Sequence, residues 1–294
     1  MLKRTVAEKI ILVSRYALAA CALSLCSPVA ADVPLTMTHG YPMVPVEIVG
    51  RQHMFVLDTG AEGSAVYPEM ANELGLPVAA AETLVGQTGS AELPNRTITS
   101  LQIDGHLCGP LKATELPARR DGLRLAGIVG LDVIGNKVLD LDVPHGRAAL
   151  LDGEAATSAI RLLGKRFPAN RVTGGLLAIP IRLDGVIGWA VIDTGARETR
   201  VNSVFARAAK LVADARPARA VNGATQNAVA VTSARVREAR FLGKRRHGRH
   251  VGVVDLPVFK AFGLADRPAM LLGIDWLSDY RLLIDFRAGS VWSR

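Results

Sequence analysis

The sequence is poor in cysteine and aromatic residues, and its charge is only mildly unbalanced. Cysteine occurs three times in 294 residues, and only Cys108 lies beyond the first 31 residues. A chain without that segment can form no internal disulfide, so its stability has to come from packing. The net charge of +8 falls to +5 without the segment, which carries four basic residues and one acidic residue. This balance is too mild to indicate nucleic acid as a partner.

The motifs of several enzyme classes are missing from the chain. Its six histidines show neither HExxH spacing nor pairing with cysteines, so no metal site is predicted. There is no GxSxG motif of serine hydrolases, and no GxxxxGK[ST] or GxGxxG motif for binding nucleotides. We therefore expect no cofactor.

The first 31 residues have the pattern of a secretory signal peptide. Four basic residues precede the apolar stretch "YALAACALSLC", and small residues at positions 29 and 31 precede Asp32. We expect cleavage there, a periplasmic or secreted protein, and no membrane span after removal of residues 1–31. An uncleaved anchor is the alternative. Lipoprotein anchoring at Cys21 ranks below both, because only five residues separate it from Arg15.

The most informative feature that is present is an internal repeat. "VPVEIVGRQHMFVLDTGA" (44–61) and "IPIRLDGVIGWAVIDTGA" (179–196) superpose without a gap at an offset of 135 residues. A second pair, "GIVGLDVIGN" (127–136) and "MLLGIDWLSD" (270–279), is offset by 143. The difference indicates an eight-residue insertion in the second copy, which we place in the basic stretch "GKRRHGRH".

Composition and repeat together predict the fold class. Short runs of Val, Ile, Leu and Ala, broken by Gly and Pro, are typical of an all-β protein with short helices. The repeat predicts two lobes, 34–152 and 171–294, with 153–170 as a linker. Each copy also contains a hairpin signal after the aspartate, "VGQTG" in the first and Asn222-Gly223 in the second, where a two-residue primed turn is expected.

The two Asp-Thr-Gly turns have a structural and a chemical interpretation. Asp and Gly can simply end a strand with a turn, as we expect at Asp104-Gly105 and Asp184-Gly185. Asp58 and Asp193 differ because lobes packed about a two-fold axis can bring equivalent turns face to face. Two carboxyl groups about 3 Å apart share one proton. One can then activate a water while the other protonates a carbonyl oxygen, without a metal, and the sequence assigns neither role.

The neighbours of the two aspartates suit such a pair. Gly60 and Gly195 lack a Cβ and allow two loops to approach closely. Thr59 and Thr194 can form hydrogen bonds to the opposite loop. The apolar runs "FVL" and "AVI" before the aspartates predict central strands that exclude water.

These paired motifs resemble the signature of aspartic peptidases. In that signature, Asp-Thr-Gly is followed later by two apolar residues and Gly, here Ile128-Val129-Gly130 and Leu271-Leu272-Gly273. The similarity is closer to the retropepsin-like branch than to pepsin, because Ala61 and Ala196 stand where pepsin-type enzymes favour a hydroxyl residue. The chain resembles a retroviral-type dimer fused into one polypeptide, and secreted bacterial proteins of this type are the nearest group.

The resemblance implies a bilobal acid-protease fold and an endopeptidase that cleaves an extended peptide or protein. Asp58 and Asp193 would be the catalytic dyad within one monomeric chain, and Thr59 and Thr194 the interlocking threonines. The two hairpins would be flaps over the substrate, with the residues Gly86, Gln87, Thr88, Gly89, Asn222, Gly223 and Ala224. Without the hydroxyl donors, we expect a dyad pKa above that of pepsin-like enzymes and activity nearer neutral pH.

Two other functional readings stay open at this point. One is a catalytically silent, protease-like module of the cell envelope that binds peptides. In the other, one lobe pairs with a lobe of a second chain. Among minor features, the basic stretch 243–250 reads as a solvated hairpin tip, with contact to anionic surfaces or a role in substrate choice as the alternative. Asp132 and Asp275 read as helix caps.

Overall fold

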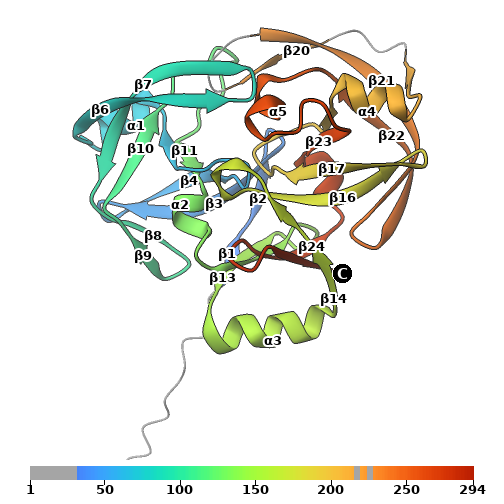
Figure 1. The fold of residues 1–294 in the computed structure, drawn as a ribbon. Coiled ribbons are helices and arrows are strands. Elements are labelled where there is room, and N and C mark those ends of the chain that lie inside the picture. Colours follow the sequence, from blue (N-terminus) through green and yellow to red (C-terminus); the bar gives the residue numbers. More distant parts are fainter. Residues whose placement is uncertain (1–31, 215–218, 224–227) are drawn as a thin grey trace, which may run out of the picture.

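In a computed structural model of the chain, residues 32–214, 219–223 and 228–294 are described. The expected signal segment 1–31, including Cys21, lies outside them. Within the described part, the strands form three sheets of ten, nine and six strands (Figure 1). This arrangement is the all-β, bilobal fold with short helices that the sequence predicts.

Lobe one is built on the ten-stranded sheet, which belongs to the first half of the chain. Its strands are β2 (Thr36–Thr38), β3 (Tyr41–Ile48), β4 (Arg51–Leu57), β5 (Ala65–Val66), β6 (Val78–Gly86), β7 (Gly89–Ile98), β8 (Leu101–Ile103), β9 (His106–Cys108), β10 (Leu111–Glu115) and β11 (Gly127–Val129). The strand β4 lies between β3 and β11, and its last three residues are buried. The run before Asp58 is therefore a central strand, as predicted.

Lobe two is built on the nine-stranded sheet and repeats this arrangement. Its strands are β15 (Asn170–Arg171), β16 (Leu177–Leu183), β17 (Val186–Ile192), β18 (Arg200–Val201), β19 (Val212–Ala213), β20 (Arg219–Asn222), β21 (Ala228–Phe241), β22 (Lys244–Val253) and β23 (Ala269–Leu272). The central strand β17 is parallel to β23, just as β4 is parallel to β11. The sequence repeat is thus a repeat of strand pairing.

The helices are short, as the breaks in the apolar runs predict. They are α1 (Pro68–Glu73), α2 (Leu131–Ile134), α3 (Gly153–Leu163), the 3-10 turn η1 (Thr173–Gly175), α4 (Ser203–Ala208), α5 (Pro257–Ala261) and α6 (Ile274–Leu277). Pro68 begins α1, and the Asn202 side chain caps α4 by accepting a hydrogen bond from the Phe205 N–H. No helix in the described ranges is long and apolar enough to cross a membrane.

The six-stranded sheet joins the two halves of the chain. It consists of β1 (Val33–Pro34), β12 (Val138–Asp142), β13 (Arg147–Leu151), β14 (Lys165–Pro168), β24 (Arg281–Asp285) and β25 (Ser290–Ser293). At its centre β12 and β24 pair antiparallel, from Val138 opposite Asp285 to Asp142 opposite Arg281. These two strands are equivalent in the repeat, so a local two-fold axis passes between them.

The two faces of this sheet serve different cores. Leu139 and Leu141 of β12 face the large core beneath the lobes, whereas Val138 packs with Ala156 and Leu163 of α3. Figure 1 shows α3 on the outer side of the sheet. The segment 153–170, expected as a linker, therefore contains a packed helix and the edge strand β14.

The basic stretch 243–250 forms the turn and first half of β22, in a long hairpin with β21. Leu242 and Gly243 have φ values of 48° and 77°, which suit a tight primed turn. Several of its arginines form ion pairs on the surface, among them Arg245 with Glu238 and Arg249 with Asp279. The prediction of a hairpin tip is confirmed.

Candidate active site

The two aspartates are held at the ends of the central strands by the second motif of each repeat. The Asp58 N–H donates to the Val129 carbonyl at 3.0 Å, and the Asp193 N–H donates to the Leu272 carbonyl at 3.0 Å. Val129 and Leu272 belong to the apolar pairs that precede Gly130 and Gly273. The later apolar-apolar-Gly motif therefore fixes the backbone of the aspartate in its own lobe.

Two threonines lock the turns of the two lobes together. The Thr59 hydroxyl donates to the Ile192 carbonyl at 2.9 Å and accepts the Thr194 N–H at 3.1 Å. Thr194 reciprocates, because its hydroxyl donates to the Leu57 carbonyl at 2.5 Å and accepts the Thr59 N–H at 3.0 Å. Both threonines are fully buried. The four bonds hold the two aspartate turns side by side across the seam.

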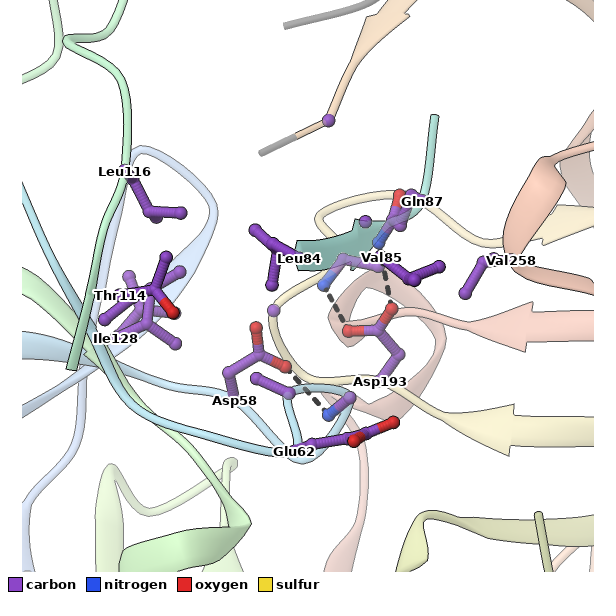
Figure 2. Close-up of a pocket in the computed structure, with 18 of the residues that line it drawn as sticks. Asp58, Glu62, Leu84, Val85, Gln87, Thr114, Leu116, Ile128, Asp193 and Val258 are labelled. Carbon is purple, nitrogen blue, oxygen red and sulfur yellow. Dashed lines mark hydrogen bonds between the residues drawn. The ribbon is translucent and has the colours of Figure 1, made fainter. Parts of the chain in front are cut away.

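The glycines of the two turns give each carboxyl group its place. A Cβ on Gly60 would lie 2.5 Å from Cγ of Asp193, and a Cβ on Gly195 would lie 2.1 Å from Oδ2 of Asp58. Each carboxyl group therefore rests against the glycine of the other lobe, where any side chain would displace it. Figure 2 shows Asp58 and Asp193 side by side. The structure thus brings the predicted pair together.

The two carboxyl groups have different electrostatic surroundings. Burial raises the pKa of Asp58 to about 8, and the negative charge of Asp193 adds to this shift against the N–H groups of Gly60 and Gly195. Burial also raises the pKa of Asp193, but the Ala196 N–H, the positive charge of Arg200 and a hydrogen bond from Asp58 counteract it. Asp193 therefore ionises first, and Asp58 keeps the proton. The direction agrees with the expected rise, although burial is its main cause.

This raised pKa makes stability depend on pH. Between about pH 4 and pH 8 the folded chain holds a proton on Asp58 that the unfolded chain releases, so the free energy of unfolding falls as pH rises. One such group contributes a slope of about 1.4 kcal/mol per pH unit. We expect Asp58→Asn to remove this slope in urea unfolding at pH 4 to 8, while the exposed Asp266→Asn keeps it. Equal slopes in Asp58→Asn and the unaltered chain would contradict the assignment.

A second carboxylate supports each turn, and here the sequence interpretation was wrong. Asp132 and Asp275 do not cap α2 and α6, whose N-cap residues are glycines. The Ser64 hydroxyl instead donates to Asp132 at 2.7 Å, and the Thr199 hydroxyl donates to Asp275 at 2.7 Å. Each hydroxyl also accepts a backbone N–H from the glycine before the helix. The carboxylates therefore tie the loop after each Asp-Thr-Gly to the following helix.

The hairpin of β6 and β7 places its tip over the dyad. Gly86 and Gly89 pair across the tip, and Gln87 and Thr88 form the turn between them, as predicted. The Gln87 side-chain amide donates to Oδ2 of Asp193 at 3.0 Å (Figure 2). This contact links the tip of lobe one to the carboxylate of lobe two.

The second hairpin differs from its prediction. Asn222 pairs with Ala228, so the connection between β20 and β21 spans residues 223–227, and a two-residue turn at Asn222-Gly223 is wrong. Gly223 lacks the positive φ that a primed turn needs, and its N–H donates to the Thr88 hydroxyl at 3.2 Å. Contact with the opposite hairpin takes the place of the turn. Ala224 lies outside the described residues.

The Gln87 contact predicts a shift in pH dependence. Its amide stabilises the ionised form of Asp193, so Gln87→Met should raise the pKa of Asp193 and move the acid limb of the kcat/KM profile upward by about one pH unit. The measurement is peptide cleavage from pH 3 to pH 8, with Ser90→Ala on the same hairpin as the matched control. An acid limb that stays in place in Gln87→Met would show that the contact does not persist in the working enzyme.

A cavity of about 780 Å³ surrounds the two aspartates and is lined by both halves of the chain. Apolar side chains such as Leu116, Ile128 and Val258 form much of its wall (Figure 2). Arg119 and Arg200, which the sequence interpretation did not select, also line it. For Arg200 a signal existed, because the offset of 135 aligns it with an alanine.

A two-lobed β fold with paired aspartates at its seam is the architecture that the resemblance to aspartic peptidases implied. The model of the aspartyl protease family matches residues 44–133 and 179–276, together more than half of the chain. The protein therefore belongs to the aspartyl protease family. Each matched region contains one copy of the repeat. A comparison with curated proteins found no match.

Proposed function

We propose that the protein is an endopeptidase that cleaves an extended peptide with Asp58 and Asp193 as its dyad. The observation that carries this proposal is the meeting of the two aspartates, one from each lobe, within a cavity of about 780 Å³. Their surroundings separate their protonation states, and such a separation is how paired carboxyl groups divide acid and base roles.

The different pKa values assign the roles that the sequence left open. Asp193, the group that ionises first, is the base that removes a proton from a water held between the carboxyl groups. Asp58, which keeps its proton, donates it to the carbonyl oxygen of the scissile bond as the water attacks. The tetrahedral centre then collapses when the nitrogen of the leaving group gains a proton. No other group needs to form a covalent bond to the substrate.

The two hairpin tips complete the proposed site. Thr88 and Gly223 are in contact above the dyad, so an extended peptide has to pass beneath them. Opening of this contact would admit the peptide, and closure would exclude water from the carboxyl groups. We propose Gly86, Gln87, Thr88, Gly89, Asn222, Gly223 and Ala224 as the flap residues that contact the peptide backbone.

We further propose that the chain acts outside the cytoplasm. The pattern of residues 1–31 supports export to the periplasm or secretion, with cleavage before Asp32. The lobes proposed from the repeat are 34–152 and 171–294. Both are supplied by one chain, which supports a monomeric enzyme.

The experiment that tests the function is a degenerate-peptide cleavage screen on the chain from Asp32 onward. Products are read by mass spectrometry at pH 4, 5.5 and 7, and Asp58→Asn and Asp193→Asn are run beside the unaltered chain. Cleavage that both variants lose supports the endopeptidase. Tight peptide binding without cleavage, unchanged in both variants, would favour a catalytically silent module instead.

A further inference from the structure

The cavity has one marked departure from two-fold symmetry, at the strand next to each aspartate turn. The short strands β5 and β18 are equivalent in the repeat, and their first residues are Ala65 and Arg200, 135 positions apart. Both residues line the cavity. Lobe one therefore presents a methyl group where lobe two presents a guanidinium group.

Arg200 is buried, and part of its guanidinium group lacks a partner. The residue is 7% exposed. Its Nη1 donates to the Glu198 carbonyl at 3.0 Å, and its Nη2 lies 3.7 Å from Oε2 of Glu198, beyond hydrogen-bond distance. Its Nε is buried and has no hydrogen-bond partner in the described structure. The edge of the group formed by Nε and Nη2 is therefore left without a close acceptor, which is costly for a buried cation.

The charged groups around Arg200 are engaged elsewhere. Asp193 belongs to the dyad, and Asp275 accepts the Thr199 hydroxyl at 2.7 Å. The Glu198 side chain is half exposed and approaches only to 3.7 Å. Arg197 adds a second positive charge, with its guanidinium group 5.1 Å from the centre of the Tyr41 ring. Burial lowers the pKa of Arg200, but a guanidinium group stays charged in proteins.

The surroundings of Arg200 in the cavity are otherwise apolar. Leu176, Val258 and Leu271 line the same part of lobe two. A single cation in an apolar wall selects for an anion, because the pairing is strong where water is excluded. The free edge of two N–H groups matches the two oxygens of a carboxylate.

We infer that Arg200 binds a carboxylate of the substrate, the side chain of Asp or Glu, on the lobe-two side of the dyad. The inference rests on the proposed endopeptidase function and names its substrate class: peptides with an acidic residue at one position on one side of the scissile bond. On the other side Ala65 offers no such partner. Arg200 is thus a specificity-determining residue.

Matched peptides test this inference. From a peptide that the chain cleaves, pairs are made that carry Glu or Gln at each position flanking the scissile bond, and kcat/KM is measured for each. We expect Glu to be preferred by about 10- to 100-fold at one position, the effect of one charge-assisted, bidentate pair. Arg200→Met, of similar length and without charge, should bring the ratio close to one. The matched control Arg197→Met, also in the cavity wall, should keep the preference.

Each other outcome also decides the inference. A Glu preference that survives in Arg200→Met, or that is lost in Arg197→Met instead, overturns it, as does the absence of any preference. If Arg200→Met does not fold, Arg200→Lys serves in its place, and the ratio should fall several-fold because an ammonium group cannot form the bidentate pair.

The inference and the proposed function fail in different ways. Cleavage that is abolished by Asp58→Asn but shows no preference for Glu sinks only the inference. If the unaltered chain cleaves no peptide, the function fails. Calorimetric binding of Glu and Gln peptides to that chain, with Arg200→Met beside it, then decides whether Arg200 recognises a carboxylate.

Discussion

Replacing Asp58 by Asn is expected to lower kcat for peptide cleavage by about 10³-fold or more, with little change in KM. An amide has the shape of the protonated carboxyl group but cannot donate an acidic proton to the scissile carbonyl, and proton transfer of this kind contributes up to about 10⁴-fold. Asp193→Asn should cause a loss of the same order because it removes the base. The measurement is single-turnover cleavage, which separates chemistry from binding.

The double variant sharpens this result. Because the two carboxyl groups act as one unit, Asp58→Asn with Asp193→Asn should lose little more activity than either change alone. Asp266→Asn, an exposed aspartate far from the dyad in sequence, serves as the control and should keep full activity. Losses that multiply in the double variant would show two independent groups and contradict the shared-proton mechanism.

Replacing Thr59 by Ala is expected to destabilise the fold by about 2–5 kcal/mol. The change leaves the Thr194 N–H and the Ile192 carbonyl buried without their partner, and each such group costs about 1–3 kcal/mol. Urea unfolding of the variant at pH 5 measures the loss. Activity should fall as well, since the same bonds hold the two aspartate turns side by side.

Thr59→Ser is the matched control for this prediction. Serine keeps the hydroxyl group and both hydrogen bonds and loses only a methyl group, at a cost of about 1 kcal/mol. Thr194→Ala should resemble Thr59→Ala, because the two residues exchange equivalent bonds across the seam. If Thr59→Ala and Thr59→Ser were equally stable, the hydroxyl network would contribute nothing to the joining of the lobes.

Much of this fold follows from local patterns in the sequence. The alternation in β4 and β17 and the glycines after the aspartates each encode a local structure, and the repeat adds that the structure occurs twice. The offset of 135 aligned Asp58 with Asp193 and Thr59 with Thr194 without any knowledge of their distance. Pseudo-symmetry turned two local motifs into one expected site.

Features that depend on contacts between distant segments could not be read in this way. The pairing of β12 with β24 joins residues 143 positions apart in the repeat, and no local pattern indicates which strand will be its neighbour. The Asn222-Gly223 pair suits a primed turn, but its contact with Thr88 of the other hairpin prevails. Asp132 follows a helix-start pattern, yet the Ser64 hydroxyl binds its carboxylate.

The six-stranded sheet that joins the halves also bears on how the molecule can evolve. In a dimer of identical subunits, a substitution in one wall of the cleft is always mirrored in the other. Here the two walls are encoded separately, and Ala65 and Arg200 already differ. A peptide runs from its amino end to its carboxyl end and has no mirror image of its own, so a fused chain can adapt each half of its cleft to one direction of the polypeptide.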